Sequence, residues 1–351
     1  MPTGRRAFLL RLASSVLPGG SRRRLIYNYH AWAPFYQEHS EKAIRAAIAP
    51  LLNTQVTTLA LSPNVGQSLS YPSRVGEMCH TPKVSEQALA NIYKGMGDIV
   101  ARAAYGVAEA WRSKRLDAFG LLVKTAVDAG LEVFASFRMN DMHMVLNEGG
   151  QGAYTDAFYR THPQWRLLRR GLNYAIPEVR RYRLAIFEEL LTRYPFHGLE
   201  LDFVRGVPFF PKGTGEQNCA VMTAFLGEVR AMMRRLNRRL ILTARVPSSL
   251  AGCRKAGLDP IAWQRGKLID LLAVGQFLHL FYRLPVRDFK VPESGVPVYA
   301  SLDYIVGGVW TGDMFLAREA NAEMYRGAAA AAYAAGADGI QFDKLPAPLL
   351  T

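Results

Sequence analysis

The alternation of apolar and polar positions is sharpest in residues 196–205. Side chains alternate along a strand, so Glu200 and Asp202 share one face of this segment. The opposite face is apolar and carries Leu199, Leu201 and Phe203. We therefore predict a buried strand that presents two carboxylates near its carboxyl end, which is where barrel enzymes carry their chemistry.

Seven further segments are short, apolar and bounded by turn residues, as buried strands are; they span 25–29, 56–61, 131–138, 240–246, 271–277, 296–302 and 340–342. Helical periodicity marks 41–52, 116–129, 177–194 and 318–335, and another helix is expected from about residue 85. The connections after the strands at 240–246 and 271–277 are poor in helical signal. Eight strands separated mostly by helices predict an α/β protein with a (β/α)8 TIM barrel. Only residues 344–351 follow the last strand, so we expect the last helix to be missing.

The length of 351 residues, half of them hydrophobic, suits one large barrel domain, expected over residues 24–351. Residues 1–23 form a separate N-terminal segment with two interpretations. Arg5 and Arg6 open a stretch that is similar to a twin-arginine export signal, but the apolar run is short and Arg11 interrupts it. The alternative is a helix that packs on the barrel of a cytoplasmic protein, so the localisation stays open.

The chain carries a formal net charge of +14, and part of the excess lies on helix surfaces such as residues 230–239. No nucleic-acid motif accompanies these residues, so we favour a solvated basic face and expect no nucleic-acid partner. An acidic polysaccharide remains open as a partner. No segment approaches the ~20 apolar residues of a membrane span, so we expect no integral membrane contact. Three scattered cysteines predict neither a disulfide framework nor a zinc cluster.

The carboxyl ends of the predicted strands are rich in polar side chains, which converge at one mouth if the barrel closes. We expect catalysis from Asp202, Glu200, Asp303 and Asp141. We expect substrate contacts from His30, Trp32, Asn64, Arg138, Asn140, His143, Arg205, Arg245, Tyr304 and Asp343. Each residue alone has a plainer explanation; Asp303, for instance, also fits a cap for the turn after its strand.

Four segments together are similar to the uncharacterised glycosyl-hydrolase-like barrels, and the resemblance covers roughly residues 24–346. They are Val133-Phe134-Ala135-Ser136-Phe137-Arg138-Met139-Asn140-Asp141, His162-Pro163-Gln164-Trp165, Asn173-Tyr174-Ala175-Ile176-Pro177-Glu178-Val179-Arg180 and Gly198-Leu199-Glu200-Leu201-Asp202-Phe203-Val204-Arg205. The resemblance implies a TIM barrel that acts on carbohydrate, without naming the sugar.

Departures from related barrels narrow the mechanism that the resemblance implies. Chitinase-type barrels carry a catalytic Glu where this chain has Val204, and His197 stands where such strands often carry Asp. The spacing is closer to α-amylase and α-galactosidase types, whose nucleophilic Asp ends the same strand, and this match points to Asp202. Amylases place an Arg two residues earlier, where this chain has Glu200.

Glycoside hydrolysis usually needs two carboxyl groups, about 5–5.5 Å apart for retention and about 6.5–9.5 Å for inversion. We assign Asp202 as nucleophile or base; its partner is Asp303, Asp141, Asp343 or Glu200, and the sequence does not choose among them. Glu200 lies one layer deeper, where direct catalysis and a buried ion pair with Arg138 or Arg245 are equally open.

The sequence lacks the residues that two other classes of barrel reaction require. The strand at 25–29 offers no paired histidines for a metal-dependent amidohydrolase, and the strand at 271–277 has no inward lysine for a Schiff base. We therefore expect no metal and no cofactor. The main rival to a glycoside hydrolase is a barrel that binds glycan without cleaving it.

Overall fold

The computed structural model describes residues 24–30, 40–79, 113–114, 116–142, 145, 154–168, 171–205, 208–236, 238–311 and 314–343. Eight parallel strands close into a barrel in the order β1-β12-β9-β8-β7-β6-β5-β2. They are β1 (Leu25–Tyr29), β2 (Thr58–Leu61), β5 (Glu132–Arg138), β6 (Gly198–Asp202), β7 (Ile241–Pro247), β8 (Leu271–Gly275), β9 (Val298–Asp303) and β12 (Gly339–Asp343). The predicted (β/α)8 barrel is confirmed, and each strand coincides with a predicted segment to within three residues at either end.

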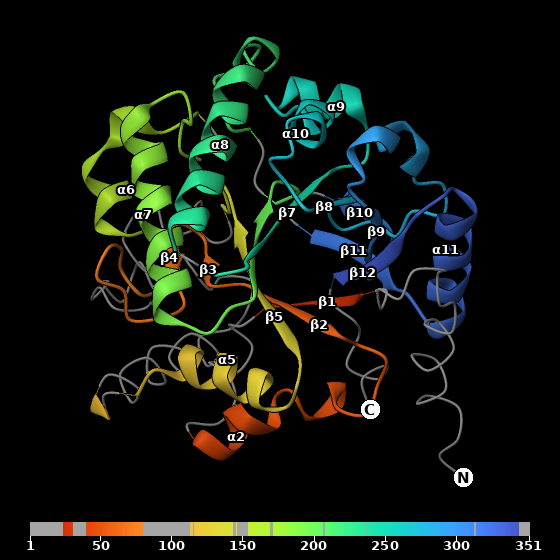
Figure 1. Cartoon of the computed structure of the whole chain (residues 1–351), viewed down its shortest axis with the longest axis horizontal. Coiled ribbons are helices and arrows are strands. Elements are labelled where there is room, and N and C mark those ends of the chain that lie inside the picture. Colours follow the sequence, from red (N-terminus) through yellow and green to blue (C-terminus); the bar gives the residue numbers. More distant parts are fainter. Residues whose placement is uncertain are drawn as a thin grey trace.

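Helices surround the strands, as Figure 1 shows. The helices are α2 (Glu41–Ala46), α5 (Ala118–Asp128), α6 (Ala157–Thr161), α7 (Pro177–Arg193), α8 (Cys219–Arg235), α9 (Leu250–Lys255), α10 (Pro260–Arg265) and α11 (Ala322–Ala334). Short 3-10 turns are η2 (Ala49–Leu51), η3 (Pro163–Trp165), η4 (Glu216–Asn218), η5 (Val286–Phe289) and η6 (Pro292–Ser294). The two connections predicted to be poor in helix contain only α9 and α10 after β7, and only η5 and η6 after β8.

Two small hairpins lie outside the barrel, β3 (Asn64–Val65) with β4 (Ser68–Leu69), and β10 (Ile305–Thr311) with β11 (Met314–Glu319). The second hairpin corrects a prediction: Arg318 pairs with Val306 in this hairpin and does not begin a helix. Helix α11 starts at Ala322 instead, where the side chain of Asn321 caps the amide of Met324. The predicted helix near residue 85, the missing last helix and the N-terminal segment 1–23 lie outside the described residues.

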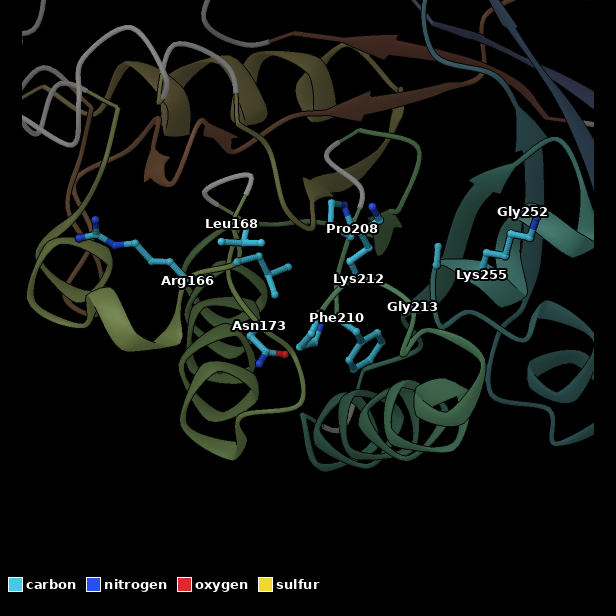
Figure 2. Close-up of a pocket in the computed structure, with 12 residues that line it drawn as sticks. Arg166, Leu168, Asn173, Pro208, Phe210, Lys212, Gly213, Gly252 and Lys255 are labelled. Atoms are coloured by element: carbon cyan, nitrogen blue, oxygen red, sulfur yellow. The ribbon is translucent and has the colours of Figure 1, made fainter.

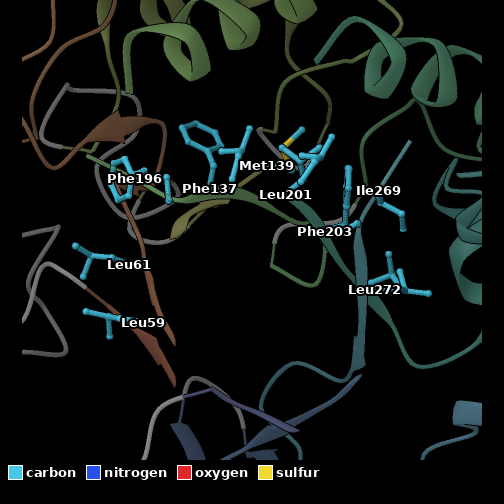
Figure 3. Packing of buried hydrophobic residues seen from close by; sticks show 14 of the residues in the cluster. Leu59, Leu61, Phe137, Met139, Phe196, Leu201, Phe203, Ile269 and Leu272 are labelled. Atoms are coloured by element: carbon cyan, nitrogen blue, oxygen red, sulfur yellow. The ribbon is translucent and has the colours of Figure 1, made fainter. Parts of the chain in front are cut away.

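The main core lies between the strands and the helices. Outward side chains on β2, β5, β6 and β8 join one buried cluster, which Figure 3 shows from close by; among them are Leu59, Leu61, Phe137, Leu201 and Leu272. Burying one such side chain contributes about 1.5–3 kcal/mol relative to leaving it in water. This apolar outer face leaves the inward positions of the same strands free for polar groups.

At the amino-terminal end of the barrel strands, aromatic rings pack directly against glycines of neighbouring strands. A Cβ on Gly198 would meet the carbonyl oxygen of Ile241 at 2.5 Å and the ring of Phe134 at 2.9 Å. Gly339 stands in the same way against the ring of Tyr299, where a Cβ would meet ring carbons at 2.4 Å. The rings fill the base of the barrel, so the polar inward residues collect above them, toward the carboxyl ends of the strands.

Candidate functional site

Glu200 forms the centre of a buried layer of neutral polar groups in the barrel. Its Oε1 accepts hydrogen bonds from Ser136 Oγ at 2.6 Å and Asn28 Nδ2 at 3.2 Å. Its Oε2 accepts one from Gln341 Nε2 at 2.9 Å. The three donors come from β1, β5 and β12, so this one carboxyl group ties its own strand to three others.

Of the two roles left open for Glu200, the ion pair with Arg138 or Arg245 is absent among the described residues, because neutral donors occupy its oxygens. Burial raises the pKa of Glu200 to about 7, and the charge of Asp202 adds to the rise. The hydrogen bonds from Ser136 and Gln341 and the charge of Arg245 act in the opposite direction. Glu200 therefore titrates near neutral pH.

Arg245 lies above this layer and joins carboxylates from two strands. Its Nη1 is 3.2 Å from Asp202 Oδ2, and its Nη2 donates to Asp343 Oδ2 at 2.8 Å. Its Nε donates to Ser301 Oγ at 2.9 Å. Burial opposes the charged guanidinium, but Asp343 and Asp202 together raise the pKa of Arg245, which keeps it charged.

Asp343 and Asp202 are close because they share this guanidinium. The two nitrogens belong to one planar fork, so the bonded oxygens lie within roughly 9 Å of each other. On the other side, Asp343 Oδ1 is 3.3 Å from His30 Nε2. Burial alone would raise the pKa of Asp343, but Arg245 and His30 hold it well below its usual range. Asp343 is therefore ionised.

Asp202 ends β6 at the mouth but is covered, with only 1% of its surface exposed. Its Oδ1 accepts the backbone amide of Val204 at 2.9 Å, and its Oδ2 contacts Arg245. Both oxygens are thus occupied, and Oδ2 has the longer contact. A substrate would have to take over one of these two positions to reach the carboxylate.

Asp303 ends β9, one strand from Asp343, with which it is paired in register. Its carboxyl accepts the backbone amides of Leu278 at 2.9 Å and Tyr304 at 2.7 Å, so it does cap the turn after its strand. Burial, and after it the neighbouring charge of Asp343, raise the pKa of Asp303 to about 7. The mouth therefore combines the ionised Asp343 with a neighbouring carboxyl group that is partly protonated at neutral pH.

Arg138 ends β5 in register with Asp202. Its Nη1 donates to Asp141 Oδ2 at 2.9 Å, and the same oxygen accepts the amide of Gly66 at 3.2 Å. The side-chain amide of Asn64 makes two hydrogen bonds to the backbone of Arg138: its Nδ2 donates to the carbonyl oxygen, and its Oδ1 accepts from the N–H. The structure thus brings Asp141 and Asn64 to the mouth, where they brace the end of β5.

The other residues predicted to contact substrate have different surroundings. Asn140 uses its amide on the backbone of Leu172 and Pro208, so it anchors loops. Arg205 follows β6 directly, and its guanidinium lies over the ring of Phe277 at 4.4 Å. Tyr304 is half-buried beside Asp303. Trp32 and His143 lie outside the described residues.

The sequence reasoning missed the inward residues one layer below the strand ends. Asn28, Ser136 and Gln341 hold Glu200, and Ser301 holds Arg245. Their signal was available, because each lies two residues before a mouth residue that was predicted, on the same face of its strand. Phe277 carried no comparable signal, since it follows β8 in an irregular segment.

A separate pocket of about 610 Å³ lies on the rim, among the segments that follow β5, β6 and β7. Its lining combines apolar residues with exposed basic ones and contains no acidic side chain; it includes Leu168, Pro208, Phe210, Lys212 and Lys255, as Figure 2 shows. Arg166 also lines it, but its guanidinium donates to the carbonyls of Tyr159 and Arg160. The pocket lies beside the mouth rather than at the carboxylates.

In the part of the chain that the structure describes, neither a metal-ligand cluster nor a membrane-spanning helix is found. No group of three or more His, Cys, Asp and Glu side chains has an arrangement that would hold a metal ion. No helix has both the length and the apolar composition needed to cross a membrane.

No protein-family model matches the sequence, and no characterised protein sequence matches it. Solved structures do match. The α-L-fucosidase isoenzyme 2 from Paenibacillus thiaminolyticus aligns over 93% of this chain and 46% of its own, with 11% identity and a TM-score of 0.52. The chitinase ChiW from Paenibacillus sp. str. FPU-7 aligns over 92% of this chain and 41% of its own, with 10% identity and a TM-score of 0.50.

This chain therefore spans less than half the length of either protein. At such identities the likeness concerns the fold, and fold alone does not define a reaction. Both neighbours carry the name of a glycosidase and share the barrel described above. The likeness therefore shows a (β/α)8 barrel fold that is similar to the folds of these two proteins.

Proposed function

We propose that the protein is a glycoside hydrolase that cleaves an oligo- or polysaccharide at the mouth of its barrel. The observation that carries the proposal is the presence, at one barrel mouth, of an ion-paired carboxylate and a carboxyl group whose pKa is raised by burial. Asp202 is ion-paired with Arg245, whereas burial raises the pKa of Asp303 to about 7. Glycoside hydrolysis uses two carboxyl groups, one that donates a proton to the leaving sugar and one that attacks the anomeric carbon or activates water.

Each group has one role in the proposed reaction. Asp303, in its protonated form, gives its proton to the oxygen of the leaving sugar. The Asp202 carboxylate attacks the anomeric carbon or takes a proton from the attacking water. Asp343, held ionised on the strand beside Asp303 by Arg245 and His30, stabilises with its negative charge the positive charge that develops on the sugar ring.

One observation favours a second function, a barrel that binds glycan without cleaving it. Asp202 is almost fully buried, and both of its carboxylate oxygens have partners. Its contacts with Val204 and Arg245 would then serve to hold the strand ends together. In that case the carboxylates contribute to stability and to the shape of the mouth. The substitution of Asp202 separates the two functions.

The test is product release from a broad panel of neutral and acidic oligosaccharides, with wild type, Asp202→Asn and Asp303→Asn measured side by side. Lys255→Met, in the rim pocket, serves as the control. For a hydrolase, we expect cleavage by wild type and the control and a loss of about 10²–10⁴-fold in each carboxyl variant. Equal glycan affinity in all four proteins without cleavage by any of them would support the binding barrel. Circular dichroism confirms that each variant is folded.

A further inference from the structure

Arg205 is a buried cation without a counter-ion among the residues that the structure describes. Only 6% of the residue is exposed, and the Nε atom is buried and has no hydrogen-bond partner. Its guanidinium rests on the ring of Phe277. An aromatic ring attracts the face of a guanidinium but satisfies none of the N–H groups at its edge.

Arg138 presents a second unsatisfied nitrogen nearby. The residue is 2% exposed, and while its Nη1 binds Asp141, its Nη2 is buried without a partner. Burial lowers the pKa of Arg138, and the charge of Arg205 lowers it further. The two guanidinium groups are therefore close enough to repel each other.

The carboxylates of the mouth attract these two arginines, Asp343 acting on Arg205 and Asp202 on Arg138, but among the described residues none of them forms an ion pair with Arg205. Asp141 is paired with Arg138, while Asp202 and Asp343 share Arg245. Burying a charged group whose N–H groups lack hydrogen-bond partners costs free energy. A hydrogen-bond acceptor from a bound ligand would remove this cost for Arg205 and Arg138. An oxyanion with two oxygens in one plane fits the fork of a guanidinium best.

We propose that Arg205 and the Nη2 edge of Arg138 bind the carboxylate of an acidic sugar. The inference rests on the proposed function for its sugar substrate and specifies the class to which that substrate belongs. Arg138 stands in register with Asp202, and Arg205 follows Asp202 by three residues. The acidic sugar therefore occupies the subsite beside the bond to be cleaved.

The experiment measures binding separately from cleavage. Oligogalacturonate and oligoglucuronate, each beside its carboxyl-reduced neutral counterpart, are titrated into wild type, Arg205→Gln and Arg205→Lys by calorimetry. Lys255→Met provides a control that removes one positive charge from the rim pocket. Sulfated oligosaccharides form a further arm, because a sulfate ester offers a different oxyanion.

We expect wild type and Lys255→Met to prefer at least one acidic oligomer over its reduced form by tenfold or more, as one charge-assisted contact provides. Arg205→Gln should lose this preference. Arg205→Lys keeps the positive charge but not the planar guanidinium, so this variant should retain only part of the preference for the acidic oligomer. A preference confined to sulfated oligomers, an equal preference in Arg205→Gln, or no preference for any acid would overturn the inference.

Cleavage of the same oligomers is scored separately, so the two proposals can fail independently. Carboxylate preference that depends on Arg205, without cleavage, would retain the subsite and reject the hydrolase. Cleavage of an acidic oligomer and its carboxyl-reduced counterpart at the same rate, unchanged in Arg205→Gln, would retain the hydrolase and reject the subsite.

Discussion

Glu200 makes stability depend on pH in a direction opposite to that of most carboxylates. Its pKa is raised to about 7 in the folded chain, from 4.5 in the unfolded chain, so the folded state binds the proton more tightly. Stability is therefore greatest below pH 4.5 as far as this group is concerned, and it falls as the pH rises toward 7. A shift of this size corresponds to about 3 kcal/mol across that window.

Glu200→Gln should remove this dependence, because an amide keeps the shape of the protonated carboxyl group and does not titrate. We expect a flatter plot of the free energy of unfolding against pH between about 5 and 7, measured by urea denaturation. Glu216→Gln, at an exposed position on η4, is the matched control. An unchanged slope in Glu200→Gln would show that Glu200 stays ionised in the fold.

Asp303 sets a pH limit on the proposed hydrolysis. Burial and Asp343 raise the pKa of Asp303 to about 7, so its acidic form is lost as the pH rises through 7. Turnover should therefore decline above about pH 7, and Asp303→Asn should abolish that limb together with most of the rate. The measurement is kcat/KM against pH for wild type. A decline that persisted in the residual activity of Asp303→Asn would assign the proton to another group.

At the scale of elements, the segment after β6 is locked against α9. A Cβ on Gly215 would lie 1.9 Å from the carbonyl oxygen of Lys255, which neither backbone can absorb without moving. Gly215→Ala should therefore cost about 2–3 kcal/mol and displace the wall of the rim pocket. In α8, by contrast, nothing lies within 4 Å of a Cβ on Gly227.

Gly227→Ala is thus a control with the opposite sign, expected to stabilise the chain by about 0.5–1 kcal/mol through helix propensity. Thermal unfolding of both variants checks the pair. Equal melting temperatures would mean that α9 shifts freely to admit the new methyl group.

The sequence predicted elements well wherever one periodicity held over a whole segment. All eight barrel strands were recognisable because their outward faces are apolar and glycine or polar turns bound them. The hairpin of β10 and β11 was missed because Arg318 and Glu319 stand beside an alanine-rich run, and helix propensity extended that run backward. The pairing of Arg318 with Val306 is a tertiary effect, which local propensity does not contain.

The site was predictable in its location and not in its connections. Strand ends converge by topology, so Asp202, Asp303 and Asp343 could be placed together at one mouth. Which carboxylate binds which arginine depends on barrel stagger and on side-chain reach. Arg245 therefore pairs with Asp202 and Asp343, while Glu200, two residues before Asp202, accepts hydrogen bonds from neutral donors only.

At the scale of the whole molecule, Arg245 is the point where the barrel ends are joined. From β7 its guanidinium reaches Asp202 on β6, Ser301 on β9 and Asp343 on β12. Arg245→Met should destabilise the chain by about 3–5 kcal/mol, because it leaves two buried carboxylates without their cation. Arg265→Met, which breaks an exposed pair with Glu293 at 3.6 Å, should cost no more than about 1 kcal/mol. Urea denaturation compares them, and equal costs would mean that solvent replaces Arg245.

The net charge of +14 gives the whole surface an attraction for acidic glycans that is independent of Arg205. Salt screens exposed charges, with a Debye length of about 10 Å at 0.1 M and about 3 Å at 1 M, while buried pairs are screened much less. Oligogalacturonate should therefore bind both wild type and Arg205→Gln in dilute buffer. As salt rises, the variant should lose its binding first, and wild type should keep a residual affinity. Calorimetric titrations across a salt series test this, with the carboxyl-reduced oligomer as the uncharged control. If both proteins lost binding along the same curve, the attraction would belong to the surface alone.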